Sequence, residues 1–226
     1  MTDNFNEVRE AYYSQYPATP FFDTWIPESK FLSADFDNKG NFAISREDDG
    51  IYGLALGEEP SIPNTWNNFS MESRGAAVLP PEYKAVVEWD CYWAPTRSGN
   101  VEATSPSTDE AIDSFLKTHA PDSSVFPGNE EILHWVEIHD KDQLVSVAAL
   151  CRWQSGRVVI SSVATHTDLR GRGYGKALME RCLNIAGVLG EESVSLGVRH
   201  TNESAQRLYA ATGFQLMHNF TYCERR

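Results

Sequence analysis

The sequence predicts an α/β (α+β) protein in which a mixed, mostly antiparallel sheet flanked by helices follows a smaller strand-rich domain. Residues 135–165 hold three apolar, strand-like runs separated by tight polar turns. A glycine cluster at residues 170–176 joins the last run to a helical pattern. Residues 96–107 are rich in Pro, Ser, Thr and Gly, which indicates a boundary. We therefore expect domains at residues 1–100 and 101–226.

The N-terminal domain has weaker local signals. Residues 13–25 are aromatic and interrupted by proline. Residues 41–46 and 51–56 flank Glu-Asp-Asp-Gly, which predicts a hairpin. Residues 57–83 contain several Pro, Gly and Asn and are predicted to be a loop, and residues 84–93 are predicted to be a strand.

The C-terminal domain is predicted to start with a helix and an antiparallel meander. Residues 107–110 (Ser-Thr-Asp-Glu) form a capping-box pattern that opens a helix with apolar residues at helical spacing. Strands are predicted at residues 135–139, 144–153 and 158–165. The polar turns between them are short, so neighbouring strands pair antiparallel.

The remaining elements follow the glycine cluster. A helix is predicted from about residue 173 to 189, and a strand at residues 193–198. Asn202 caps a short helix that Gly213 closes, and residues 214–223 form the last strand. The predicted order is helix, three strands, helix, strand, helix, strand.

Composition restricts the partners and the compartment. The chain has 32 acidic and 19 basic residues, a formal charge of −13. This charge repels nucleic acid and anionic membranes, so we expect neither as a partner; it attracts cations and also favours solubility. With no signal-peptide pattern and no membrane-length apolar run, we expect a cytoplasmic protein, monomeric or dimeric. Widely spaced cysteines predict free thiols and no metal site: Cys91, Cys151, Cys182 and Cys223.

The glycine cluster predicts a phosphate site. Residues 170–176 read Arg-Gly-Arg-Gly-Tyr-Gly-Lys between a strand and a helix. Glycines let backbone N–H groups approach a ligand, helix N-termini bind phosphates, and two arginines and a lysine add positive charge. A Walker A loop fails because Ala177 follows Gly175-Lys176, and a GxGxxG fingerprint fails because Lys176 stands at its third glycine. The alternative is a turn whose glycines serve geometry alone.

Two motifs resemble the GNAT superfamily of N-acetyltransferases. The hallmark Arg/Gln-x-x-Gly-x-Gly/Ala is intact from Arg170 to Gly175, and residues 161–179 resemble the family's strand–loop–helix throughout. The second hallmark appears as Asn202 and Ala205, then Leu208-Tyr209 and Gly213-Phe214. The resemblance covers about residues 106–226, and the layout is similar to two-domain GNAT proteins with a divergent N-terminal half.

The resemblance implies acetyl-CoA as co-substrate and assigns roles to residues. The strand before the loop would diverge from its neighbour and bind the pantetheine arm through its backbone. The loop would bind the diphosphate. Asn202 would contact pantetheine and also cap a helix. Tyr209 would protonate the leaving thiolate; the alternative is a core aromatic. The implied co-substrate residues are Val163, Ala164, Thr165, Arg170, Gly171, Arg172, Gly173, Tyr174, Gly175, Lys176 and Asn202, and the implied catalytic residue is Tyr209.

The chain departs from the family pattern in two places. Many relatives carry a glutamate base on the strand before the loop, but this chain has Ser161 and Ser162 there. Candidate bases nearby are Glu137, His139 and His166. Only twelve residues follow Phe214, where the family usually forms two strands, so either one long strand suffices or the N-terminal half supplies the other.

These observations predict an acyl-CoA-dependent N-acetyltransferase that moves an acetyl group from acetyl-CoA to a small-molecule or peptide amine. Because an aliphatic amine is only about one part in 2,500 neutral at pH 7, a base or a desolvated pocket must supply the free amine. Residues 1–100 would help to complete the acceptor site. The alternatives are a non-catalytic CoA-binding sensor or interaction module, and a nucleotide-binding protein, which the failed motifs disfavour.

Overall fold

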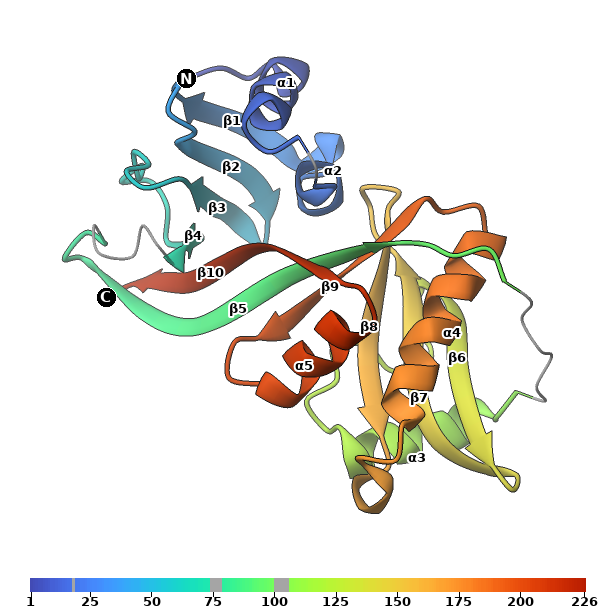
Figure 1. Cartoon of the computed structure of the whole chain (residues 1–226). Coiled ribbons are helices and arrows are strands. Elements are labelled where there is room, and N and C mark those ends of the chain that lie inside the picture. The colour runs from blue at the N-terminus through green and yellow to red at the C-terminus, as the bar shows by residue number, and fades with distance from the viewer. Residues whose placement is uncertain (18, 74–78, 100–105) are drawn as a thin grey trace. The chain divides into compact units, whose positions relative to one another are not determined.

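The computed structural model describes residues 1–17, 19–73, 79–99 and 106–226 (Figure 1). Parts of the predicted aromatic segment (residue 18), loop (residues 74–78) and boundary (residues 100–105) lie outside the described residues. The chain divides into two compact units that alternate along the sequence. The first unit comprises Met1–Cys91, Gly197–Glu203 and Leu216–Arg226, and the second comprises Tyr92–Leu196 and Ser204–Gln215.

The N-terminal half supplies the helices and most of the strands that the structure describes in the first unit. These elements are α1 (Phe5–Gln15), α2 (Phe21–Trp25), β1 (Phe31–Phe36), β2 (Phe42–Asp48), β3 (Gly50–Leu56), β4 (Asn68–Glu72) and the start of β5 (Tyr83–Pro95). Strands β2 and β3 pair antiparallel with Asp48 opposite Gly50, which confirms the predicted hairpin. Gly50 has a φ of 102°, a backbone conformation that favours glycine.

Strand β4 shows that the predicted loop at residues 57–83 was wrong in its middle. Phe69 and Met71 of β4 are buried in a cluster with Trp66. Strand β4 pairs parallel with β3 and antiparallel with β10 (Gln215–Arg225). Strand β4 has only five residues, lies among Pro and Asn, and is joined to neither partner by a tight turn, so it gave no local strand signal. The N-terminal half therefore supplies β10 with a neighbouring strand, which is one of the two outcomes that the sequence left open.

A buried polar chain ties β10 to the N-terminal half. The Tyr12 hydroxyl lies 2.8 Å from Nε2 of His218, and Nδ1 of His218 lies 2.6 Å from Oε1 of Glu72. The Gly57 N–H donates to the other oxygen of Glu72 at 2.7 Å. The side chains of Tyr12, Glu72 and His218 are all buried. Losing one of them would therefore remove a hydrogen bond from a buried polar partner.

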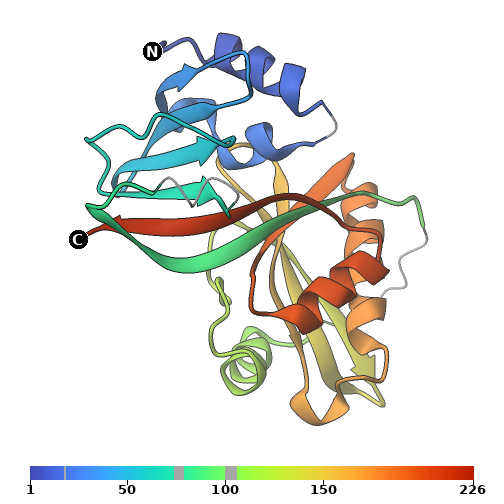
Figure 2. The same ribbon diagram turned by 60° about the vertical axis from the view of Figure 1, so that its left-hand side comes forward.

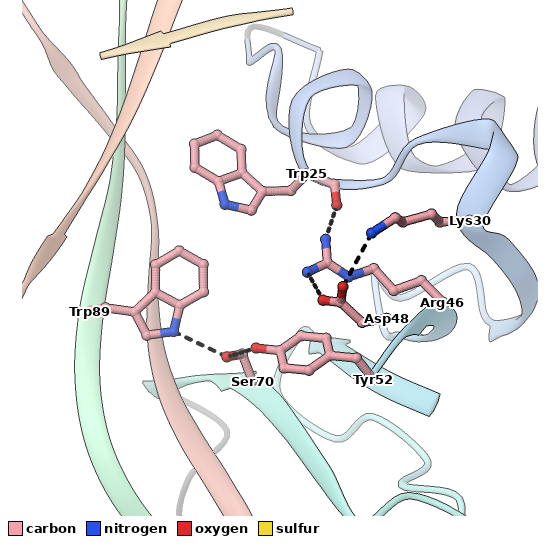
Figure 3. A network of polar contacts seen from close by, with 7 residues as sticks. All are labelled: Trp25, Lys30, Arg46, Asp48, Tyr52, Ser70 and Trp89. Atoms are coloured by element: carbon pink, nitrogen blue, oxygen red, sulfur yellow. Dashed lines mark hydrogen bonds and ion pairs between the residues drawn. The ribbon is translucent and has the colours of Figure 1, made fainter. Parts of the chain in front are cut away.

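A second polar network joins α2 to four strands of the same unit (Figure 3). The Arg46 guanidinium donates to the Trp25 carbonyl and lies 4.8 Å from the centre of the Tyr52 ring. The Ser70 hydroxyl receives the Trp89 indole N–H at 3.0 Å and lies 2.6 Å from the Tyr52 hydroxyl. Arginine stacking and hydrogen bonding of the aromatic polar atoms fix these rings in place.

The second unit contains the predicted meander. Its elements are α3 (Asp109–His119), β6 (Ile132–Asp140), β7 (Gln143–Arg152), β8 (Val158–Thr165), α4 (Tyr174–Val188), most of β9 (Ser193–Arg199) and most of α5 (Glu203–Ala211). The strand order is β9-β8-β7-β6; β9 runs parallel to β8 and the other pairs are antiparallel. Helices α3 and α4 cover opposite faces (Figures 1 and 2). The predicted fold class is confirmed.

The start of α3 differs from the predicted capping box. The N-cap is Thr108, whose hydroxyl accepts the Ala111 N–H at 3.3 Å. The Ser107 N–H instead donates to the Glu137 carboxylate at 3.1 and 3.2 Å. The helix begins at Asp109, one residue later than the predicted capping box implies.

Within the described part of the chain, none of the helices is long and apolar enough to cross a membrane.

Candidate functional site

Strand β8 contains a β-bulge just before the glycine loop. Ala164 faces Val147 and Ser161 faces Ala149, so the residues between them on β8, Ser162 and Val163, both oppose a single residue of β7. Ser162 has a φ of 51°, which is uncommon for a residue other than glycine. The bulge re-aims the last three residues of β8 relative to the rest of the strand.

Two hydrogen bonds hold the bulge in this conformation. The Ser162 hydroxyl donates to the Val125 carbonyl at 2.7 Å and accepts the Val125 N–H at 3.0 Å. Ser162 is buried, so both bonds are shielded from water. Ser162, one of the two serines on the strand before the loop, therefore has a structural role in this chain.

Strands β8 and β9 pair near the start of β8. Their facing residues are Val159 and Ser195. Residues 163–165 come after this pair: Val163 is the second residue of the bulge, and Ala164 and Thr165 follow it. The Ala164 carbonyl accepts the Ser146 hydroxyl at 2.7 Å on the side of β7. The β8 backbone thus runs on past its pairing with β9 toward the glycine loop.

Two glycines shape the turn between β8 and α4. Gly171 and Gly173 have φ angles of 78° and 91°, and a Cβ at either would meet no atom within 4 Å. Positive φ, and not crowding, is therefore the reason for glycine at these positions. The Ala177 N–H makes a helical bond to the Gly173 carbonyl at 3.0 Å. The N–H groups that precede it in the first turn have no intrahelical acceptor and form an electropositive end.

The third glycine of the cluster has a different reason. A Cβ on Gly175 would lie 3.3 Å from Cδ2 of Leu208 and 3.5 Å from the Thr165 hydroxyl. Gly175 thus lets the start of α4 approach both α5 and the end of β8. The three glycines together place a helix N-terminus directly after the bulged strand.

The charged and aromatic side chains of the cluster differ in their surroundings. Arg172 is exposed. Nζ of Lys176 lies 3.9 Å from Oε1 of Glu180, and both side chains remain largely exposed. The Tyr174 hydroxyl donates to the Asp140 carboxylate at 2.6 Å, and this bond raises the pKa of Tyr174. Tyr174 therefore anchors the start of α4 to the end of β6.

Asn202 lies in the first unit, immediately before α5. Its N–H donates to the Arg199 carbonyl at 2.9 Å, and the residue is exposed. Two residues earlier, Nδ1 of His200 lies 3.1 and 3.2 Å from the oxygens of Asp90, which is 2% exposed and also accepts the Asn219 amide. The buried carboxylate thus orients a half-exposed imidazole. The members of this group lie on separate elements, so no sequence motif marks it.

Tyr209 lies on α5 in the second unit and is 5% exposed. Its ring centre is 5.9 Å from that of Tyr92 and 5.9 Å from that of Phe214. Burial, with smaller contributions from Cys182 and Tyr92, raises the pKa of Tyr209 above its ordinary value. Its hydroxyl therefore stays protonated at neutral pH, as a proton donor must.

Two of the three candidate bases on or near the meander lie together. Nε2 of His139 is 3.4 Å from the Glu137 carboxylate and 3.2 Å from the Ser107 hydroxyl. Glu137 also lines an open cavity of about 370 Å³ beside the start of α3. Glu137 faces Val147, which in turn faces Ala164, so it stands two strand spacings, about 10 Å, from β8. That separation is too long for direct contact with an atom on β8.

The third candidate base, His166, follows β8 directly. Its Nδ1 accepts the Asp168 N–H at 3.3 Å, and its ring centre lies 4.1 Å from that of His119. Within the described ranges, no group of three or more His, Cys, Asp or Glu residues is placed to hold a metal ion.

Comparison with known proteins identifies the family. A sequence model described as the acetyltransferase (GNAT) family matches residues 92–214, which is more than half of the chain. The chain therefore belongs to the GNAT family.

Solved structures share the fold. An acetyltransferase of the GNAT family from Colwellia psychrerythraea superposes with a TM-score of 0.56 at 14% identity, over 98% of this chain and 96% of that one. A GNAT-family protein from Novosphingobium aromaticivorans gives a TM-score of 0.52 at 18% identity, over 65% and 69% of the two chains. At these identities the likeness concerns the fold alone.

Curated relatives match a shorter stretch. Uncharacterized N-acetyltransferases of Mycobacterium tuberculosis and Mycobacterium bovis are 37% identical over 78 residues, 34% of this chain and 49% of theirs. The chain thus spans about half the length of the curated relatives it matches.

Proposed function

We propose that this chain is an N-acetyltransferase that moves the acetyl group of acetyl-CoA to an amine by direct attack. The observation that carries the proposal is the start of α4, where glycines at positive φ follow a bulged strand and precede an electropositive helix end. The N–H groups of residues 171–176 would bind the diphosphate of acetyl-CoA. Backbone amides and a helix dipole suit such an anion without any charged side chain.

The remaining co-substrate contacts would come from β8 and from the start of α5. Residues 163–165 would bond to the pantetheine arm through their backbone, which the end of the β8–β9 pairing supports. Asn202 would contact the same arm while preceding α5. A main-chain N–H beyond the bulge would hold the oxyanion that forms on the thioester carbonyl.

The reaction needs two proton transfers. The amine nitrogen forms the new C–N bond, the C–S bond breaks, and its electron pair leaves on sulfur. A base takes the proton of the attacking nitrogen, and the Tyr209 hydroxyl gives its proton to the thiolate. Tyr209 is protonated at neutral pH, as a donor must be, but burial raises its pKa and makes it a weaker acid than an ordinary tyrosine.

The wider setting follows from charge and cysteine chemistry. Residues 1–100 would contribute to acceptor binding, and the acceptor would be a small-molecule or peptide amine. A formal charge of −13 favours cationic acceptors over nucleic acid. All four cysteines are free and buried, which suits the reducing cytoplasm that we propose as the compartment.

Thiol release from acetyl-CoA with a panel of amines tests the activity. Turnover with at least one amine supports the enzyme. Tight acetyl-CoA binding without thiol release across the panel would favour the second candidate, a CoA-binding module, which Ser161 and Ser162 in place of the family glutamate also favour.

The substitution Gly173→Asp is expected to weaken acetyl-CoA binding at least tenfold, about 1.4 kcal/mol. The new carboxylate would sit at the start of α4, where negative charge stabilises the helix but competes with the diphosphate. Open space around this position and the tolerance of Asp for positive φ favour a folded variant. Calorimetry with acetyl-CoA measures the loss.

Gly173→Asn is the matched control, because it has the same shape and backbone strain without the charge. It should lose clearly less affinity than Gly173→Asp. Unchanged affinity in a folded Gly173→Asp protein would contradict the assignment of the diphosphate to this loop.

A further inference from the structure

The end of α3 is tied to the start of the glycine loop by one histidine. Nδ1 of His119 accepts the Thr167 N–H at 3.4 Å and lies 3.2 Å from the Thr167 hydroxyl oxygen. The main-chain carbonyl of His119 accepts Nη2 of Arg170 at 3.0 Å, and Nε of Arg170 donates to the Thr165 carbonyl at 3.3 Å. Arg170 thus bonds to the backbone of both α3 and β8. His119 is the residue of α3 that contacts both Thr167 and Arg170.

The bond from the Thr167 N–H requires a neutral ring. A lone pair on Nδ1 of His119 must accept the Thr167 N–H, which places the ring proton on Nε2. The ring centre of His119 lies 4.6 Å from that of Phe115 and 4.1 Å from that of His166. The charged or titratable groups that face it are His166, Arg170 and Asp168.

The surroundings of His119 disfavour its protonation. Partial burial, then the neighbouring His166 and Arg170, lower the pKa of His119 below the ordinary value near 6.5, and Asp168 opposes them weakly. Because the folded pKa is depressed, the neutral contact is fully present above about pH 6.5 and is lost as pH falls through the folded value. Protonation would remove the acceptor on Nδ1 and add a cation beside Arg170.

We propose that His119 is a positioning residue for the acyl-CoA loop, and that its neutral ring fixes the Thr167–Arg170 segment so that the following glycines present their N–H groups to the diphosphate. This inference rests on the proposed function. Acetyl-CoA affinity should therefore fall with acidification because His119 becomes protonated, in addition to any effect of protonation of acetyl-CoA itself.

Two variants separate the hydrogen bond from the ring. His119→Asn keeps an acceptor near the position of Nδ1 but does not titrate. His119→Phe keeps a stacked ring but has no acceptor. His134→Asn, on the exposed part of β6, is the control for loss of a histidine elsewhere. Calorimetry with acetyl-CoA at pH 7.5 and pH 5.5 stays above the sequence pI of about 4.8.

On acidification, the wild-type protein and His134→Asn should lose about threefold to tenfold more affinity than His119→Asn. The loss in His119→Asn measures the effect of the titration of acetyl-CoA itself. His119→Phe should bind severalfold more weakly at both pH values. An equal acid-induced loss in the wild-type protein and His119→Asn, or wild-type affinity in His119→Phe, would overturn the proposal.

A second measurement does not depend on acetyl-CoA. In the free protein, backbone hydrogen exchange of residues 167–173 should be faster in His119→Phe than in the wild-type protein at pH 7.5. At pH 5.5 it should be faster in both His119→Phe and the wild-type protein than in His119→Asn. If acetyl-CoA does not bind at all, the proposed function fails while this result still decides whether His119 orders the loop. Identical exchange in all three proteins would show that His119 does not order residues 167–173.

Discussion

A chain that begins at residue 101 is expected to be insoluble or inactive, although it contains the glycine loop and Tyr209. The first reason lies in β10, which pairs with β4 of the N-terminal half. Phe220 and Cys223 of β10 are fully buried, and Phe220 stacks on Trp89 and Phe21 with ring centres 4.9 and 5.4 Å apart. Exposing such side chains costs about 1.5–3 kcal/mol each and leaves an apolar edge strand open to aggregation.

The second reason lies inside the second unit, which starts at Tyr92. The Thr96 N–H donates to the Glu192 carbonyl at 3.0 Å, and the Arg97 N–H donates to the Leu183 carbonyl at 3.2 Å. A Cβ on Gly187 would come within 2.3 Å of the Arg97 carbonyl oxygen, so α4 is shaped to receive this segment. A cut at residue 100 removes these contacts from the unit that carries the loop.

Soluble yield, thermal melting and thiol release from acetyl-CoA would be measured for residues 101–226 and for the full chain. Co-expression of residues 1–100 with residues 101–226 is the control, since the lost contacts are non-covalent and should partly re-form. A 101–226 protein that melts cooperatively and turns over like the full chain would show that the N-terminal half is an independent module.

Local patterns predicted the parts of the fold whose partners are near in the sequence. The meander β6–β7–β8 has short turns, and the glycine loop has its strand and helix on either side, so periodicity and turn residues were sufficient. Strand β4 was missed because it is only five residues long, lies among loop-forming residues, and pairs parallel with β3 and antiparallel with the distant β10, so no tight turn marks it. The exchange of segments between the two units, with residues 197–203 and 216–226 in the first, has no local signal either.

The site shows the same limit at the level of single residues. The glycines that need positive φ could be recognised from the motif, whereas the reason for Gly175 is its distance from Leu208, which no motif records. His119 meets Thr167 only because α3 ends where β8 ends. The pairing of His200 with Asp90 likewise depends on strands that meet in space. Motifs identified the glycines and Tyr209, whereas the contacts of Gly175, His119 and His200 depend on elements that are distant in the sequence.

Tyr209→Phe is expected to lower kcat by about 10²-fold with little change in acetyl-CoA affinity. The change removes one hydroxyl and keeps the ring that packs between Tyr92 and Phe214. A proton donor contributes roughly 10²–10⁴-fold to rate, and a thiol with a pKa near 8.5 leaves readily enough to place the effect at the lower end. Stability should change by only about 1 kcal/mol, the scale of one hydrogen bond.

The control is Tyr92→Phe, the same chemical change on the neighbouring ring, which should keep wild-type kcat. Steady-state kinetics, acetyl-CoA calorimetry and thermal melting would be run on both variants. Because burial raises the pKa of Tyr209 above its ordinary value of 10, the donor stays protonated through the alkaline range, and its loss should lower the rate equally at pH 7 and pH 9. Full activity in Tyr209→Phe would show that water or another group protonates the thiolate, and Tyr209 would then be a packing residue of α5.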